Sequence, residues 1–516
     1  MTAPLTQTAR VALNVLSNYV RFGISLIVFF LLTPFVIGKV GESDFGLWSL
    51  TWATLICFTL LDFGFGTAVV RYVGECKGRN DVARRNRLLS SLAVMYVLLA
   101  GLGMIAVCVL SLFFTRLFSI QGEQQHRALA LLWILGVRMV GLGLPLAMFR
   151  GVLLGEQRIV LLNAVQAASA VVYGFLAWMA LARGYGIVAL AWVNLAAALI
   201  EHLAYIVLAF RFVKGLRISL RLADWALFKE AASFSAFAFM ASVATLVLLR
   251  TDPIIVKIFL PLSAVAVYAV GLRIAEQAYL LMKQFTYALG PFVAELEGVG
   301  DIEKIRFVLV NCAKFALAPG VLLSVAVCSF SREAVVFWIG PQFAGAGPVL
   351  AILMIAMALS LPTVVASEVF TMTGNPKVTA RASVISVVLN LGASIALARP
   401  LELVGVALGS LISTVVVGVT MICAGCRTYQ VRYRAYLRRV FVSTLCPGAS
   451  QLIVTWAVKW WLPPTGLVTI ALEALPGAAL SLALFWWLFV EPSEKRLLAE
   501  RLLKWRRVQE ISAPRI

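Results

Sequence analysis

The chain has 516 residues, of which 62% are hydrophobic and 13% are charged, and its mean hydropathy is +0.95. This composition leaves too little polar surface for a water-soluble domain and predicts a polytopic membrane protein. The net charge of +20 could suggest a nucleic-acid-binding protein, but the basic residues gather in short connections between apolar segments. We therefore read the positive charge as a topology signal and expect no nucleic-acid partner.

Apolar segments long enough to cross a hydrocarbon core of ~30 Å recur about fourteen times along the chain. Most Lys and Arg residues lie in connections on the same side as the N-terminus, and the positive-inside rule places that side in the cytoplasm. We predict an all-α fold with about 14 transmembrane helices, both termini in the cytoplasm and an uncleaved first span. The expected span centres are Ile24, Thr59, Gly101, Met139, Tyr173, Ala197, Ser242, Gln277, Ala318, Met357, Leu391, Val415, Leu452 and Leu480.

The first span carries a polar stripe. Asn14, Asn18, Arg21 and Ser25 are three or four positions apart, so they share one face of a helix. A charged side chain at bilayer depth costs several kcal/mol, so this face should point into the bundle, with Arg21 as its deepest member. The turn Gly38–Gly41 is expected to end the helix.

The second span contains a buried carboxylate, Asp62, in the glycine-rich run 61–66. Asp62 could pair with Arg21 or Arg71, or it could exchange a proton during coupled transport. The fourth span also contains a charged residue, the cation Arg138. Further along, Gly151 and Gly155 form a small-xxx-small pair that predicts close helix packing.

A basic linker divides the chain into similar halves. Short matches between the halves recur at an offset of about 220 residues, which predicts two six-helix lobes in a parallel pseudo-two-fold repeat, with a substrate site at their interface. The predicted domains are an N-terminal lobe (1–212), a cytoplasmic interfacial linker (213–230), a C-terminal lobe (231–426), an appended helix pair (427–490) and a cytoplasmic amphipathic tail (491–516).

The seventh and eighth spans hold the densest set of intramembrane charges. Arg250 and Asp252 lie beside Pro253, which can kink a helix next to a cavity. In the eighth span a polar stripe at helical spacing should face an aqueous cavity, unless Glu276 forms a permanent ion-pair network there. Its members are Arg273, Glu276, Gln277, Lys283, Gln284 and Tyr287.

Metal and redox chemistry have little support in the sequence. The eight Cys are scattered, and the chain has two His. Cys423 and Cys426 have CxxC spacing, but there is no second Cys pair, so packing is the preferred interpretation. We expect no metal, no cofactor and no disulfide framework.

Several short motifs together resemble one family. They are residues 37–50 (IGKVGESDFGLWSL), 61–66 (LDFGFG) and 252–256 (DPIIV), Tyr268 with Arg273, and Gly290 with Pro291. The chain resembles the polysaccharide transporter branch of the multidrug/oligosaccharidyl-lipid/polysaccharide (MOP) exporter superfamily. The resemblance implies a Wzx-type flippase that moves an undecaprenyl-pyrophosphate-linked oligosaccharide across a bacterial inner membrane by alternating access, for O-antigen, capsule or exopolysaccharide synthesis. Membrane lipids, a polysaccharide polymerase and assembly proteins are the implied partners.

The intramembrane charges agree with an anionic substrate, because cations outnumber carboxylates and guanidinium groups suit phosphate oxygens. Asp62, Asp252 and Glu276 are the candidates for ion pairing or for coupling to a proton or sodium gradient. The expected substrate-binding residues are Arg21, Arg138, Arg250, Arg273, Lys283, Gln277 and Gln284.

Other functions stay open at this point. A multidrug or ion antiporter and a lipid II flippase belong to the same superfamily, although the first span lacks an Arg-Arg-Pro-like run that would favour the second. A channel or scaffold for polysaccharide assembly is a further reading. A membrane glycan transferase or ligase would normally carry a large outside loop or a catalytic carboxylate cluster. The sequence has neither, so we expect a transporter and not an enzyme.

Overall fold

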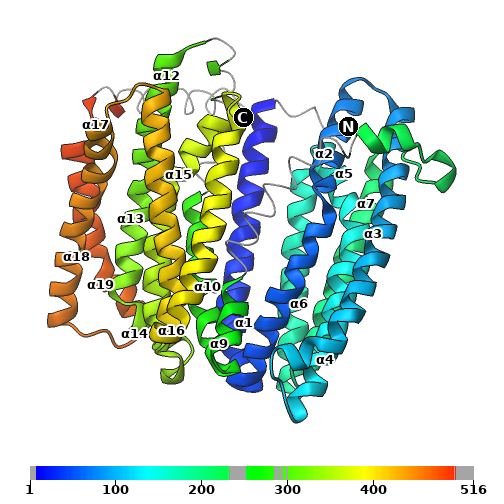
Figure 1. Ribbon diagram of the computed structural model, residues 1–516, viewed down its shortest axis with the longest axis horizontal. Coiled ribbons are helices and arrows are strands. Elements are labelled where there is room, and N and C mark those ends of the chain that lie inside the picture. The colour runs from blue at the N-terminus through cyan, green and yellow to red at the C-terminus, as the bar shows by residue number, and fades with distance from the viewer. Residues whose placement is uncertain are drawn as a thin grey trace, which may run out of the picture. The chain divides into compact units, whose positions relative to one another are not determined.

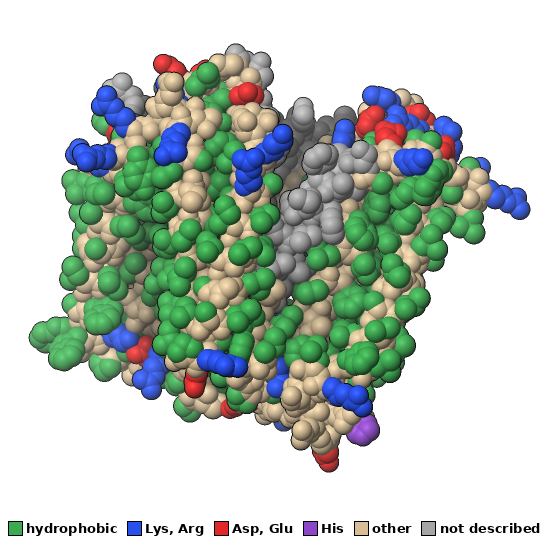
Figure 2. Space-filling model, in the orientation of Figure 1, with side chains coloured by type: hydrophobic (Ala, Val, Ile, Leu, Met, Phe, Trp, Pro, Cys, Tyr) green, Lys and Arg blue, Asp and Glu red, His purple; other side chains and the backbone are tan. Residues whose placement is uncertain are grey.

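The computed structural model of the chain describes residues 7–230, 251–283 and 300–492, together with positions 232, 289, 293, 296, 297, 494 and 495. These described residues form helices, turns and connections, with no β-strand among them. Eleven of the described helices are long and apolar enough to cross a membrane. The chain is therefore an all-α polytopic membrane protein, as the composition predicts. Figure 2 shows hydrophobic side chains along the helices and charged side chains near their ends.

Two long helices each combine two predicted spans. Gly41 (φ 82°) interrupts α1, and Glu402 (φ 50°) interrupts α16, so each residue marks the turn between two consecutive spans. Gly41 lies in the turn that the sequence predicts. With these two interruptions counted as turns, the predicted span centres lie in helical segments, except Ser242, which falls outside the described residues.

The chain divides into two compact units (Figure 1). Unit 1 combines Met1–Val270 with Ser386–Ser410, and unit 2 combines Gly271–Ile385 with Leu411–Ile516. Helices α10 and α16 each contribute to both units. These limits differ from the predicted domain boundaries, and the two-lobe repeat stays a prediction.

Besides residues 386–410 of α16, unit 1 contains a series of helices that begins with the long kinked α1. They are α1 (Gln7–Leu55), the 3-10 helix η1 (Ile56–Asp62), α2 (Phe65–Gly78), α3 (Val82–Leu117), α4 (Glu123–Gly136), the π-helix η2 (Val137–Leu142), α5 (Gly143–Gly155), α6 (Ile159–Ala182), α7 (Ile187–Phe212), the 3-10 helix η3 (Leu220–Leu222), α9 (Asp252–Phe259) and α10 (Leu262–Lys283).

Besides residues 271–283 of α10, unit 2 contains helices of very different lengths, several of them interrupted by π-helical turns. They are α12 (Ile302–Phe307), the π-helix η5 (Val308–Cys312), α13 (Ala313–Ser329), α14 (Ser331–Trp338), the 3-10 helix η6 (Pro341–Phe343), α15 (Ala346–Met372), α16 (Pro376–Thr428), α17 (Tyr433–Leu437), the π-helix η7 (Arg438–Val442), α18 (Ser443–Trp461), α19 (Leu467–Leu484) and the π-helix η8 (Phe485–Phe489).

Glycines set the close helix contacts of unit 1. A Cβ on Gly151 would lie 2.8 Å from Val69 Cγ1, and one on Gly155 would lie 2.7 Å from Val73 Cβ. Helix α2 therefore packs closely against the predicted small-xxx-small pair of α5, as expected for a small-residue helix interface. On α1, Gly46 packs against the backbone carbonyl of Leu262, which brings the second half of α1 against the start of α10.

The last two spans pack as a pair. Gly477 of α19 lies directly against Thr455 and the Gln451 carbonyl of α18, so the two backbones approach closely. Gly448 of α18 in turn packs on Val321 of α13. The pair is thus joined to unit 2 through α13.

Candidate functional site

Unit 1 contains a partly open polar cavity among its membrane-spanning helices. Its volume is about 180 Å³, and it is bounded by η2, α6 and α7. At ~30 Å³ per water molecule, the cavity could hold about six waters or one small polar ring. Its lining residues are Arg138, Gln166, Ser169, Ala170, Tyr173, Asn194, Ala197, Ala198 and Glu201.

Arg138 brings a positive charge into this cavity. It lies on the π-helix η2, and single π-helical turns within α-helices are frequent at functional sites. The guanidinium lies 4.9 Å from the centre of the Trp52 ring, a cation–π contact that fixes its plane. Its Nε is buried and has no hydrogen-bond acceptor among the described residues. The side chain therefore keeps a hydrogen-bond donor for a ligand or for water.

Glu201 supplies the acidic side of the cavity. Its carboxylate accepts hydrogen bonds from Ser169 Oγ (3.0 Å) and from Tyr205 Oη (2.7 Å). Asn194 lies seven positions earlier on the same face of α7, as the spacing predicts, and its Oδ1 is buried with no donor among the described residues. With one cation and one anion, the cavity has no net charge and offers both a donor and an acceptor.

Arg21 lies on the face of α1 that packs on α6. Asn163 of α6 donates hydrogen bonds from Nδ2 to Ser17 Oγ (2.8 Å) and to Asn18 Oδ1 (2.9 Å), which confirms that the polar stripe of the first span faces other helices. Arg21 Nε is buried without a hydrogen-bond acceptor within the described chain. Sequence periodicity identified this stripe, but it could not identify Asn163 as its partner.

Asp62 has a different environment from the one expected. It ends η1, and Phe63 and Gly64 then take left-handed conformations (φ 46° and 79°) that turn the chain into α2. The carboxylate accepts from the Gly66 backbone N–H (3.1 Å to Oδ2) and from Tyr96 Oη (2.7 Å). In the described structure these contacts take the place of the predicted pairing with Arg21 or Arg71. A carboxylate at the start of α2 is also favoured by the helix dipole.

Asp252 begins α9 and is almost fully buried, with 3% exposure. Its Oδ2 accepts hydrogen bonds from Tyr268 Oη and from Ser410 Oγ (3.1 Å), and Ser410 Oγ accepts one from Asn390 Nδ2 (2.9 Å). Pro253 occupies the first turn of α9, where proline is favourable. The predicted kink also concerns the residues before Thr251, which lie outside the described part of the chain. We call Asp252, Tyr268, Ser410 and Asn390 the Asp252 cluster.

The sequence pointed to individual members of the Asp252 cluster, but it did not predict that they contact one another. Ser386, Asn390 and Ser394 recur every four positions along α16, so they share one face, and all three are buried. Ser410 was missed, because a single serine in an apolar span carries no signal of its own. The spacing of polar residues within α16 gives no information about their contact with α9.

The stripe of the eighth span lies on α10. Arg273, Glu276, Gln277 and Lys283 belong to unit 2 and are all partly exposed. Lys283 Nζ lies 6.0 Å from the centre of the Tyr279 ring. Arg250, Gln284 and Tyr287 fall outside the described residues. The remaining predicted site residues, Arg21, Asp62, Arg138 and Asp252, belong to unit 1.

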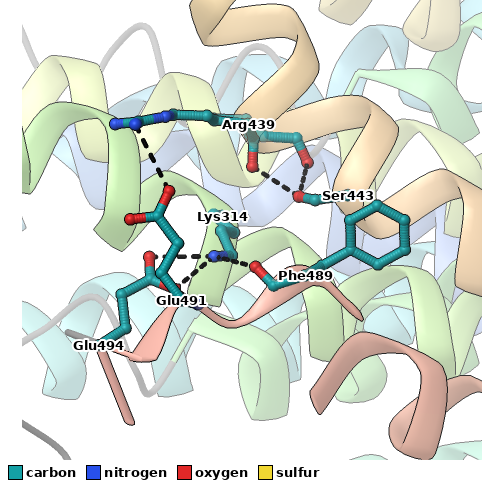
Figure 3. A network of polar contacts seen from close by, with 7 residues as sticks. Lys314, Arg439, Ser443, Phe489, Glu491 and Glu494 are labelled. Carbon is teal, nitrogen blue, oxygen red and sulfur yellow. Dashed lines mark hydrogen bonds and ion pairs between the residues drawn. The ribbon is translucent and has the colours of Figure 1, made fainter. Parts of the chain in front are cut away.

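A second charged cluster lies in unit 2 and was not predicted as a unit (Figure 3). Lys314 of α13 donates to Glu494 Oε2 (2.7 Å) and to the Phe489 carbonyl (2.7 Å), and both charged side chains are only 4% exposed. Glu494 also accepts from the Glu491 N–H, and Glu491 pairs with Arg439 at 3.4 Å. A lysine near the end of an apolar span often extends toward the membrane surface, but Lys314 does not. It instead closes a buried ion pair that fastens the end of the last span to α13.

The cysteines offer no assembled site in the described part of the chain. Cys426 is buried, Cys423 is partly buried, and both are free thiols. No group of three His, Cys, Asp or Glu side chains among the described residues has the geometry to hold a metal ion.

Comparisons with known proteins give a consistent family. A model of the family described as polysaccharide biosynthesis protein matches residues 8–296, more than half of the chain. A MatE family model matches residues 236–395. The uncharacterised membrane protein EpsK of Bacillus subtilis (strain 168) is 22% identical over 456 residues, which cover 86% of this chain and 88% of EpsK.

Solved structures share the fold. The lipid II flippase MurJ in an inward closed conformation superposes with a TM-score of 0.71 at 14% identity, over 92% of this chain and 98% of MurJ. An inward-facing multidrug resistance MATE family transporter of the MOP superfamily superposes with a TM-score of 0.63 at 16% identity, over 81% of this chain and 99% of the transporter. A MOP superfamily transporter from Pyrococcus furiosus Vc1 superposes with a TM-score of 0.59 at 15% identity, over 81% of this chain and 95% of that transporter.

Proposed function

We propose that this chain, which belongs to the polysaccharide biosynthesis protein family and to the MOP exporter superfamily, transports a polyprenyl-pyrophosphate-linked oligosaccharide across a membrane. In this proposal the substrate is an undecaprenyl-linked precursor of O-antigen, capsule or exopolysaccharide. The membrane is the bacterial inner membrane, and the transport cycle uses alternating access. A polysaccharide polymerase would be the next protein to use the product. The role is transport and not catalysis.

The observation that carries the proposal is the state of two arginines inside membrane-spanning segments. Arg21 and Arg138 have no carboxylate within 4 Å among the described residues, and each has a buried Nε without an acceptor. Arg138 shares its cavity with Glu201. A charge held at this depth is costly even so, and the presence of both arginines favours a function that uses them. Guanidinium groups bind phosphate and carboxylate oxygens with paired hydrogen bonds, which suits a pyrophosphate or an acidic sugar.

The cavity beside Arg138 suits the glycan part of the same substrate. It has no net charge, and it presents an unused donor on Arg138 and an unused acceptor on Asn194. A sugar hydroxyl is both a donor and an acceptor, so one hydroxyl could satisfy both groups. Trp52 and Tyr173 add aromatic surface near this polar lining.

Charge reversal tests the proposal. In cells that lack the native gene, Arg21→Glu and Arg138→Glu should each abolish surface polysaccharide and leave lipid-linked glycan accumulated in the membrane. The protein level must stay normal, as measured by immunoblot of membranes. Arg183→Glu is the matched control, because Arg183 is exposed beyond the end of α6. Normal polysaccharide export by both charge-reversed variants would contradict the assignment.

A further inference from the structure

The segment 213–230, which we call the linker platform, is fixed to one end of unit 1 (Figure 1). It follows the end of α7 and lies against the first turns of α3. Four buried polar side chains of α3 hold its backbone. The contacts are Arg85 Nη2 to the Lys214 carbonyl (2.8 Å), Asn86 Nδ2 to the Gly215 carbonyl (2.7 Å), the Ser219 N–H to Ser90 Oγ (3.1 Å) and the Asp224 N–H to Ser91 Oγ (2.7 Å).

The platform carries an unneutralised positive charge. Its two acidic residues are both paired with arginines of α3: Asp224 with Arg87 (3.8 Å) and Glu230 with Arg84 (2.7 Å). Its four basic residues are exposed, and none has a carboxylate within 4 Å in the described chain. They are Lys214, Arg217, Arg221 and Lys229.

Exposed apolar side chains accompany this charge. Leu220 is 79% exposed and Trp225 is 63% exposed. The Trp225 ring stacks on Phe228 with the ring centres 4.8 Å apart, and Phe228 contacts Phe65 of α2 at 5.8 Å. Lys229 Nζ also lies 5.9 Å from the centre of the Trp225 ring. The indole is therefore held by two neighbouring side chains while most of its surface stays exposed. Figure 2 shows basic and hydrophobic side chains side by side at this end of unit 1.

The position of the platform identifies its partner. The platform begins one residue after Phe212, where a membrane-spanning helix ends, so it lies at the depth of the lipid headgroups. Trp is enriched at this depth, and basic residues beside apolar ones are typical of segments that lie on anionic membranes. Soluble anions would not explain the exposed Leu220 and Trp225, whereas a phospholipid satisfies both the charged and the apolar groups.

We propose that the linker platform binds the headgroups of anionic phospholipids such as phosphatidylglycerol. The phosphates lie against the basic residues, and Leu220 and Trp225 insert between the acyl chains. Because four hydrogen bonds fix the platform to α3, bound lipid holds this end of unit 1 at the membrane surface. This binding does not depend on the transported substrate.

The experiment uses the full chain, purified in detergent and examined by native mass spectrometry with added dioleoylphosphatidylglycerol or dioleoylphosphatidylcholine. The wild-type chain should bind phosphatidylglycerol in preference to phosphatidylcholine. The variant R217Q/R221Q/K229Q should lose this preference, with affinity for phosphatidylglycerol reduced about fivefold for each removed charge. Raising the salt concentration should reduce the wild-type preference in the same direction.

The control variant K39Q/R116Q/R183Q removes three exposed charges of unit 1 that lie away from the platform. It should keep the wild-type preference for phosphatidylglycerol. The thermal stability of each variant is measured, and lipid binding is compared only between variants whose stability is equal. If the triple variant unfolds, K214Q/R217Q replaces it. A wild-type chain without lipid preference, or equal losses in the platform and control variants, would overturn the proposal.

Discussion

Asp252 shows how a single buried side chain depends on its hydrogen bonds. Its carboxylate is nearly inaccessible and accepts from Tyr268, whose ring is fully buried. Removing a donor from a buried carboxylate leaves the charge less well satisfied, which costs more than losing a bond between two neutral groups. Tyr268 therefore stabilises the fold through its bond to Asp252.

We expect Tyr268→Phe to lower the free energy of unfolding by about 1–3 kcal/mol, because the shape is kept and only the bond to Asp252 is lost. Chemical unfolding in detergent measures the change. Tyr429→Phe is the matched control, since Tyr429 Oη shares a hydrogen bond with the neutral Thr373 hydroxyl. The decrease in the free energy of unfolding should be smaller for Tyr429→Phe than for Tyr268→Phe. An equal or larger loss for Tyr429→Phe would show that the Asp252 contact is not the stronger one.

Among the helices, the end of the last span depends on one ion pair. Lys314 and Glu494 are buried together, and Lys314 also donates to a backbone carbonyl at the end of η8 (Figure 3). Lys459 of α18 offers a close comparison, because it pairs with Glu333 at 2.7 Å and donates to the Ser329 carbonyl at 2.7 Å. That second pair is 28% and 32% exposed. The two lysines thus differ mainly in burial.

Lys314→Met should destabilise the chain by about 3–5 kcal/mol, because it leaves Glu494 buried without its cation. Lys459→Met should cost less than about 1 kcal/mol, since water can solvate Glu333. The double variant K314M/E494M should recover much of the loss, because it removes both buried charges. Thermal unfolding of the three variants in detergent provides the measurement. Equal effects for the two lysines would contradict the role given to burial.

At the scale of the whole molecule, the sequence predicts the succession of spans better than the contacts between them. Apolar segments of membrane-crossing length define each helix locally, and Gly41 marks a turn because it can adopt a positive φ. Helical spacing also places the polar stripe of Arg21 on an interior face. Spacing along one helix does not reveal which other helix that face meets. The pairs Asp252–Ser410 and Lys314–Glu494 join residues far apart in the chain, so they became visible only in the structure.

We propose that an ion gradient drives the transport, and the two buried carboxylates of unit 1 are not equivalent as candidates for that coupling. Asp62 already accepts hydrogen bonds from a backbone N–H at the start of α2 and from Tyr96, so its carboxylate stabilises the turn between η1 and α2. Asp252 lies among side-chain hydroxyl and amide groups, whose oxygens can reorient toward a proton or a sodium ion. Asp252 is therefore the better candidate for coupling.

We expect glycan transport by the full chain in liposomes to respond to an imposed proton or sodium gradient. One charge moving through 100 mV corresponds to ~2.3 kcal/mol, or about a 50-fold change in the distribution of substrate. Asp252→Asn should abolish this response, whereas Asp62→Asn should retain it, because an amide oxygen can still accept from Gly66 and Tyr96. Transport by the wild-type chain that ignores both gradients would remove the coupling hypothesis. Loss of the response in Asp62→Asn alone would instead assign the coupling to Asp62.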